Sequence, residues 1–272
     1  MSQRKLSKSI YYLGTGLLAI GFIIPLVWAL VSSVSPAAGT AQTDGYGLGN
    51  YVKLFTYGAG LPLYLKNSLV ISAVCVLVTL VVATTGGYAF ARFSFPFKNA
   101  LFVLVLSIMM VPYAALLIPL IVWMKDLGMA NSLVGVGLVL ALFQLPFSVF
   151  MMRNAFAALP RDLEDAALID GCGSFTAFTR ILLPSVLPSL VTIGLFSYLA
   201  AWNDFMVSLY LLGMDNSPLP LALVNMRQQT IGVIDYGLTT AGVVVLTVPA
   251  FILFLALQRY YIKGMTSGAV KG

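Results

Sequence analysis

Long apolar stretches make up most of this chain, and short polar segments separate them. Six stretches, each about 20 residues or longer, can cross the roughly 30 Å of a bilayer's hydrocarbon core as helices. They cover residues 10–34, 68–90, 101–123, 133–152, 187–212 and 237–261. The runs are continuous and rich in Leu, Val and Ile, whereas strands of a membrane barrel show short segments of alternating polarity. The pattern therefore predicts an all-α integral membrane protein with six transmembrane helices.

Composition supports this prediction. Of the 272 residues, 60% are hydrophobic and 9% are charged, which is too apolar for a soluble domain of this length. The polar interruptions are at most about 35 residues long, too short for an independent core. We therefore expect a single transmembrane domain over residues 1–272, with the first apolar stretch as an uncleaved anchor because it is longer than the apolar part of a signal peptide. The two cysteines, Cys75 and Cys172, are too few and too far apart to predict a disulfide framework or a metal site.

Basic residues are unequally distributed between the two sides that six helices would create. Eleven of the 15 lie in the N-terminus, the second loop, the fourth loop and the C-terminus. The others are Lys53, Lys66, Lys125 and Arg227. Because Lys and Arg accumulate in cytoplasmic loops, both termini and the fourth loop, residues 153–185, are predicted to be cytoplasmic. This bias also accounts for the net charge of +6 without a nucleic-acid partner.

Two longer segments fall on the opposite side, at residues 35–67 and 213–236, and the first is rich in Gly. Such composition indicates turns. The segments are either plain connections or, together, a docking surface or a lid.

Five prolines lie inside four of the predicted helices. They are Pro25, Pro112, Pro119, Pro146 and Pro249. Each lacks a backbone donor, which a helix bundle tolerates where neighbouring groups satisfy the freed carbonyls, so these positions predict kinks.

The fourth loop differs from the other connections because it has the pattern of two short helices. Its first helix carries three acids in its first turns, where the helix dipole favours carboxylates: Asp162, Glu164 and Asp165. Gly171 breaks this helix, Ser174 is positioned to cap the next one, and Pro184 is expected to end it. We predict that both helices lie along the membrane surface.

This loop contains a specific motif. Residues 164–171 read E-D-A-A-L-I-D-G, and I-L-L-P follows at Ile181 to Pro184. The spacing resembles the E-A-A-x3-G-x9-I-x-L-P signature of permease subunits of binding-protein-dependent ATP-binding-cassette importers. The one departure is Asp165, which stands where the signature has Glu, although Glu164 precedes it.

In that family the motif forms the coupling helix, which fits a cleft on the ATPase subunit. The resemblance implies a contact through Asp165, Ala166, Ala167 and Gly171, with Glu164 as a possible substitute for the family glutamate. The residue types suit this role. Small alanines let another surface approach closely, glycine permits a sharp turn, and acids offer charge-assisted contacts.

Further stretches are similar to the carbohydrate branch of this family, the permeases of the maltose-transporter type. They are G-Y-A-F-A-R-F at 87–93, L-I-P-L at 117–120, L-P-R-D-L-E at 159–164, W-N-D-F at 202–205 and the C-terminal stretch from 257 to 272. The resemblance implies a sugar or oligosaccharide as the solute. Polyols and glycerol-phosphate-type solutes are alternatives within the same branch.

The fifth apolar stretch contains the chain's most deeply placed ionisable residue. Asp204 lies about 24 Å along a helix from Pro188. This position falls in the outer part of the bilayer, where a carboxylate faces a cavity, bonds a neighbouring helix or sits in the interfacial zone. Tyr198, Trp202 and Asn203 lie nearby and offer the aromatic and amide groups that bind sugars, so these four residues are candidates for the solute path.

No catalytic constellation is predicted. The chain has no histidine and no G-x-x-x-x-G-K-[ST] phosphate loop, so ATP and Mg²⁺ are expected on a separate subunit. The resemblance implies the partners: two ATPase subunits, a second and non-identical permease subunit, and an extracytoplasmic solute-binding protein. It also implies the cytoplasmic (inner) membrane of a bacterium or archaeon, with lipid around the helices.

Two other classes of function predict different sequence features. An ion-driven secondary transporter would have internal repeats and intramembrane ligands for the coupling ion, and Asp204 alone gives little support for one. A structural or assembly protein of the membrane would have no use for an ATPase-docking motif.

Overall fold

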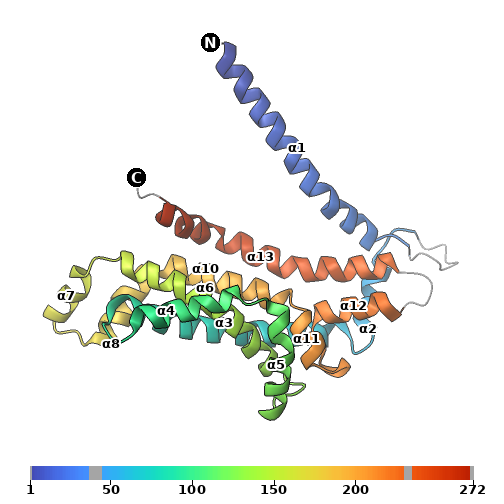
Figure 1. Ribbon diagram of the computed structural model, residues 1–272. Helices are drawn as coiled ribbons and strands as arrows, with labels where there is room; N and C mark the ends of the chain where they lie inside the picture. Colours follow the sequence, from blue (N-terminus) through green and yellow to red (C-terminus); the bar gives the residue numbers. More distant parts are fainter. Residues whose placement is uncertain (1, 37–44, 230–234, 270–272) are drawn as a thin grey trace. The chain divides into compact units, whose positions relative to one another are not determined.

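The structure, a computed structural model, describes residues 2–36, 45–229 and 235–269. All regular elements in these ranges are helical (Figure 1). The α-helices are α1 (Ser2–Ser33), α2 (Gly49–Thr56), α3 (Leu61–Arg92), α4 (Lys98–Ser107), α5 (Tyr113–Asp126), α6 (Leu133–Ala158), α7 (Asp162–Ile169), α8 (Ser174–Ala177), α9 (Leu183–Ser185), α10 (Leu187–Trp202), α11 (Met206–Leu211), α12 (Leu219–Gln229) and α13 (Tyr236–Ala269). Three short helical turns join them, namely η1 (Ile108–Met110), η2 (Phe178–Leu182) and η3 (Met214–Asn216).

Four of the predicted spans are single long helices. Within the described residues, the segments long and apolar enough to cross a bilayer are Ile10–Ser33, Leu61–Arg92, Leu133–Ala158 and Tyr236–Arg259. The helices continue through Pro25, Pro146 and Pro249, so these prolines do not end them. Two bent helix pairs bring the number of spans to as many as six.

The third span is not the continuous helix predicted over 101–123. Lys98–Met110 and Tyr113–Asp126 meet at 103°. The turn falls at Val111, whose φ of −81° and ψ of 126° are extended, and Pro112 precedes the first residue of α5. A residue before proline is driven out of the helical region by steric contact with the proline ring, so Pro112 breaks this span rather than kinking it.

The fifth span was also predicted too long, at 187–212. Helix α10 ends at Trp202, and α11 begins at Met206. The carboxylate of Asp204 accepts hydrogen bonds from the backbone N–H groups of Val207 and Ser208. A short polar side chain that bonds the backbone in this way competes with helix continuation and starts a new helix instead.

The segments predicted as irregular also contain helix. Helix α2 lies within residues 35–67, and η3 and α12 lie within 213–236. The side-chain amide of Asn50 in α2 donates to the carbonyl oxygens of Ser33 and Ser35, at 3.0 and 2.7 Å. These bonds hold α2 to the end of α1. Residues 37–44 and 230–234 lie outside the described part of the chain.

Packing groups the chain into two compact units. The first unit comprises Met1–Pro62 and Ala222–Val248, and the second comprises Leu63–Leu221 and Pro249–Gly272. The second unit contains the fourth loop and the residues around Asp204. Its central helices are α6 and α10, which lie side by side (Figure 1).

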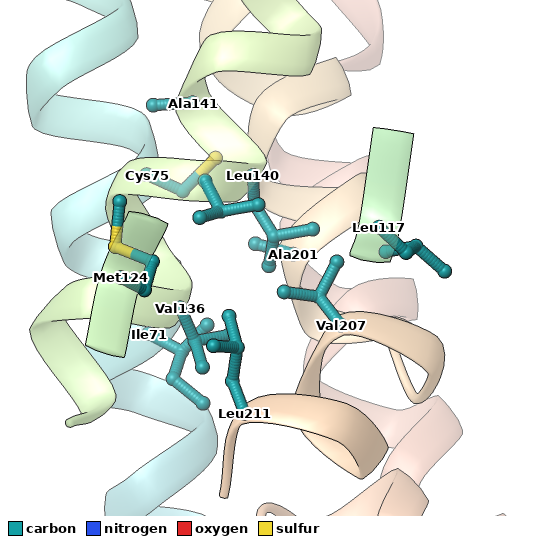
Figure 2. Close-up of a cluster of buried hydrophobic side chains, with 11 residues drawn as sticks. Ile71, Cys75, Leu117, Met124, Val136, Leu140, Ala141, Ala201, Val207 and Leu211 are labelled. Carbon is teal, nitrogen blue, oxygen red and sulfur yellow. The ribbon is translucent and has the colours of Figure 1, made fainter. Parts of the chain in front are cut away.

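Two apolar clusters form the core of the second unit. Figure 2 shows the first, to which α3, α5, α6, α10 and α11 contribute; it comprises Ile71, Cys75, Leu117, Met124, Val136, Val139, Leu140, Ala141, Ala201, Val207 and Leu211. The second joins α3, α4 and α6 to the fourth loop and α10, through Ala83, Tyr88, Phe102, Val149, Met152, Phe156, Leu182, Val186 and Ile193. Helices α3 and α6 contribute to both clusters and so connect the fourth loop to the Asp204 region.

Helices α3 and α6 approach each other closely at two glycines. A Cβ atom at Gly137 of α6 would lie 2.7 Å from the Cβ of Val74 and 3.0 Å from the carbonyl oxygen of Ile71. A Cβ atom at Gly87 of α3 would lie 2.5 Å from the Cβ of Met152 and 2.8 Å from the backbone nitrogen of Arg153. In the membrane, where helix association depends on close packing, small residues let two backbones approach in this way.

Candidate functional sites: the fourth loop and a polar pocket

The fourth loop forms the helical hairpin that its sequence indicates, with two differences at the second helix. Gly171 follows α7 with a φ of +84°, a left-handed conformation that glycine adopts without strain. The residue preceding α8 is Gly173, so Ser174 is the first helical residue and not the predicted cap. Pro184 does not end the second helix, because helical structure continues from Ser174 to Ser185 before it bends by 75° into α10.

Glu164 points into the chain and ties α7 to α3. Its Oε1 atom accepts a 2.7 Å hydrogen bond from the hydroxyl of Tyr88, and its Oε2 atom lies 3.4 Å from the Nε atom of Arg92. The guanidinium of Arg92 also donates to the carbonyl oxygen of Leu159, at 3.1 Å. These contacts join the end of α3 to both the start of the loop and its first helix. We call Tyr88, Arg92 and Glu164 the α3–α7 latch.

The other motif residues divide between the interior and the surface. Ala167 is only 3% exposed, so its small side chain serves packing within the chain. Asp165, Ala166, Gly171 and Pro184 are exposed, and Ile181 is half-buried. Two large apolar side chains are also strongly exposed, Ile169 at 85% and Phe175 at 78%. We call the surface formed by four of these exposed residues the exposed loop face; it comprises Asp165, Ala166, Ile169 and Phe175.

An exposed apolar face on a polar loop needs a partner. The loop is too charged to sit in hydrocarbon, since Arg161, Asp162, Asp165 and Asp170 are all exposed within it. Two exposed large apolar side chains close to exposed acids have the character of a protein interface, in which apolar anchors are surrounded by a polar rim.

The second region surrounds the carboxylate of Asp204. Its Oδ1 atom accepts from the hydroxyl of Tyr113, at 3.0 Å, and from the backbone N–H of Val207, at 3.4 Å. Its Oδ2 atom accepts from the backbone N–H and the hydroxyl of Ser208, at 3.1 and 3.2 Å. Because Tyr113 is the first residue of α5, its bond to Asp204 joins the break before α5 to the break between α10 and α11.

A polar pocket of about 310 Å³ opens beside this carboxylate. Its lining comes from α5, α6, α10 and the α10–α11 break, and comprises Tyr113, Leu140, Phe143, Gln144, Ala200, Asn203, Asp204, Phe205 and Met206. Within membrane spans, irregular backbone is tolerated where it is buried in protein or lines a cavity, and the α10–α11 break lines this pocket.

The structure separates the four predicted path residues. Asn203 and Asp204 line the polar pocket. Trp202 is 1% exposed, and its ring stacks on Tyr198 with centroids 5.4 Å apart. Tyr198 lines a different cavity of about 580 Å³, which is otherwise formed mainly by apolar residues of α3, α10 and α13. Only Asn203 and Asp204 of the predicted set are therefore together at one polar site.

The sequence prediction missed Gln144 and Tyr113. Gln144 stands alone as an amide within the apolar run from 133 to 152, and this is the signal that could have found it. Tyr113 had no such signal, because a tyrosine beside a proline is unremarkable until the fold brings it to Asp204.

The fold and these two regions define a multi-pass α-helical membrane transport subunit. Residues 83–267 match the family described as "Binding-protein-dependent transport system inner membrane component". The chain belongs to this family, whose members are the permease subunits of ATP-binding-cassette importers.

Several relatives that are named as permease proteins match this chain along nearly its whole length. The arabinooligosaccharides transport system permease protein AraQ of Halalkalibacterium halodurans is 34% identical, over 94% of this chain and 96% of its own. The trehalose/maltose transport system permease protein MalG of Thermococcus litoralis is 31% identical over 100% of both chains. The diacetylchitobiose uptake system permease protein DasC of Streptomyces coelicolor is 31% identical over 94% of both.

Solved structures show the same fold. A chain of a bacterial ABC transporter involved in the import of the acidic polysaccharide alginate aligns with a TM-score of 0.81 at 19% identity, over 96% of this chain and 98% of the other. A chain of a bacterial alginate ABC transporter in complex with a pentasaccharide-bound periplasmic protein aligns with a TM-score of 0.70 at 13% identity, over 94% and 95%.

Proposed function

We propose that this chain is a permease subunit that forms the translocation path for a sugar or oligosaccharide together with a second, non-identical permease subunit. Two separate ATPase subunits bind ATP and Mg²⁺ and drive the transport, and an extracytoplasmic solute-binding protein delivers the solute. The names of relatives that match nearly the whole chain support the solute class. The observation that carries the coupling role is the exposed loop face, within a motif typical of coupling helices.

The loop contacts suggest how ATPase movement reaches the membrane. A partner that holds Ile169 and Phe175 moves α7 and α8. The latch connects α7 to α3, and the helical segment from Ser174 to Ser185 connects α8 to α10 through a bend of 75°. Helices α3 and α10 also reach the Asp204 region, so a displacement of the loop can change the pocket by a movement of packed helices.

The docking proposal is tested by purifying the tagged chain in mild detergent from cells that express the whole transporter. Wild-type chain is expected to bring an ATPase subunit with it. Ile169→Asp is expected to abolish this recovery, because it places a charge where an apolar anchor would be desolvated on binding.

The matched control for this substitution is Phe97→Asp. Phe97 is 81% exposed in the second loop, and its left-handed backbone, with a φ of 59°, suits aspartate. This variant should retain the ATPase. Equal loss in both variants, or ATPase recovery with Ile169→Asp, would contradict docking through the loop face. Uptake of maltose, trehalose, diacetylchitobiose and arabino-oligosaccharides by the intact complex then tests the solute class.

We also propose that both termini face the cytoplasm. The termini lie on the same side as the second and fourth loops, and this side carries most of the Lys and Arg residues. A reporter that is active only outside the cytoplasm should stay inactive when fused after Gly272 and become active when fused after Asp126. Activity in the reverse pattern would overturn both the orientation and the cytoplasmic docking site.

A further inference from the structure

The polar pocket contains an amide that the protein itself does not satisfy. Gln144 lies in the middle of α6 and is half-buried, and its side chain makes no hydrogen bond to any described residue. A free amide in hydrocarbon costs several kcal/mol, on the order of 2–7. An amide of this kind within an apolar span therefore faces water or a polar ligand.

Asp204 is not the ligand-binding group of this pocket. Both of its oxygens already accept hydrogen bonds from Tyr113, Val207 and Ser208. These bonds fix the break between α10 and α11 and so position Asn203 and Phe205, the residues on either side of Asp204. Its neighbour Asn203, an exposed residue of the pocket lining, donates its amide to the carbonyl oxygen of Leu199 at 2.8 Å, and its Oδ1 atom accepts no hydrogen bond from a described residue.

We propose that Gln144 and Asn203 form a solute-binding subsite for a neutral, hydroxyl-bearing molecule. Gln144 offers both donors and an acceptor, and Asn203 offers an acceptor. The rings of Phe143 and Phe205, which also line the pocket, suit the C–H faces of a sugar. The subsite deepens the proposed function and rests on it.

The charges of the pocket select against acidic solutes. Of the described residues that line it, none is Lys or Arg, and the carboxylate of Asp204 lies at its wall. An anionic solute would meet a like charge with no cation to offset it, in a setting where screening is weak. The subsite therefore favours a neutral sugar or polyol over a phosphorylated or uronic-acid solute.

The first test measures whether the pocket contains water in the assembled transporter. In a chain with Cys75→Ser and Cys172→Ser, Gln144→Cys should react with a water-soluble, membrane-impermeant thiol reagent applied to open membrane sheets. The control is Leu142→Cys, two residues away and about 200° around the same helix. Labelling of position 144 no faster than of position 142 would overturn the subsite.

The second test uses Gln144→Leu in the intact transporter, with radiolabelled maltose and trehalose as probes. Loss of one or two hydrogen bonds should lower uptake at saturating solute about three- to tenfold. ATP hydrolysis stimulated by the solute-binding protein should persist, and Gln144→Asn should restore part of the uptake. Unchanged uptake by Gln144→Leu and by Asn203→Ala would overturn the subsite.

These outcomes separate the two proposals. If the ATPase does not co-purify and uptake does not need ATP, the proposed function fails. If ATP-dependent uptake persists but the pocket variants behave as wild type, only the subsite fails.

Discussion

Gly87→Ala is expected to destabilise the protein, whereas the neighbouring Gly86→Ala is not. A Cβ atom at Gly87 would lie 2.5 Å from the Cβ of Met152 and 2.8 Å from the nitrogen of Arg153, so α3 and α6 would have to move apart. At Gly86 the nearest atom is 3.8 Å away, which is ordinary contact. Both changes bring the same gain in helix propensity, so the difference between them isolates the cost of overpacking, about 1–3 kcal/mol.

Thermal unfolding of both variants in the same mild detergent measures this difference. Gly86→Ala should unfold at or slightly above the wild-type Tm, and Gly87→Ala should unfold below it. Because the contact lies next to the α3–α7 latch, Gly87→Ala should also weaken recovery of the ATPase. Equal Tm values for the two alanine variants would show that α3 and α6 do not pack as closely as described.

Glu164→Ala is expected to uncouple ATP hydrolysis from transport. Removal of the carboxylate leaves the hydroxyl of Tyr88 and the largely buried guanidinium of Arg92 without their shared partner, and α7 loses its tie to α3. Leaving such groups unpaired costs about 1–3 kcal/mol. A loss of about 1.4 kcal/mol corresponds to a tenfold change in equilibrium, so solute uptake per ATP hydrolysed should fall about tenfold.

Two matched variants distinguish this role from docking. Glu164→Gln keeps an acceptor for Tyr88 but loses the charge that faces Arg92, so its uptake should lie between wild type and Glu164→Ala. Asp165→Ala removes the adjacent, exposed acid and should weaken ATPase recovery without lowering the Tm. If Glu164→Ala prevents ATPase recovery while uptake per ATP stays normal, Glu164 acts in docking and not as a latch.

The positions of four spans followed from the sequence because uninterrupted apolar runs need a helix to satisfy the backbone in lipid, although α3 begins seven residues earlier and α6 ends six residues later than predicted. The two misjudged spans show the limit of this rule. At Pro112 and at Asn203–Asp204 the apolar run continues but the helix does not. Hydropathy measures only the tendency to enter the bilayer, whereas a proline or a capping carboxylate decides the local backbone conformation.

The motif of the fourth loop indicated a two-helix element and the family, but not the direction of each side chain. Adjacent acids have opposite placements, since Glu164 contacts α3 and Asp165 is exposed. Ala167 is buried and Ala166 is exposed for the same reason, because successive residues on a helix point about 100° apart. Only the packing of α7 against α3 decides which of them is available to a partner.

By itself, then, the sequence determined that the chain forms apolar helices long enough to cross a membrane, and that its fourth loop carries the motif of its family. These properties depend on local composition and spacing. The tertiary structure alone decided that Tyr113 meets Asp204 across 91 residues, that Gln144 opens into the same pocket, and that Glu164 joins α7 to α3. Such contacts depend on the helix rotations that close packing imposes, and one sequence does not specify those rotations.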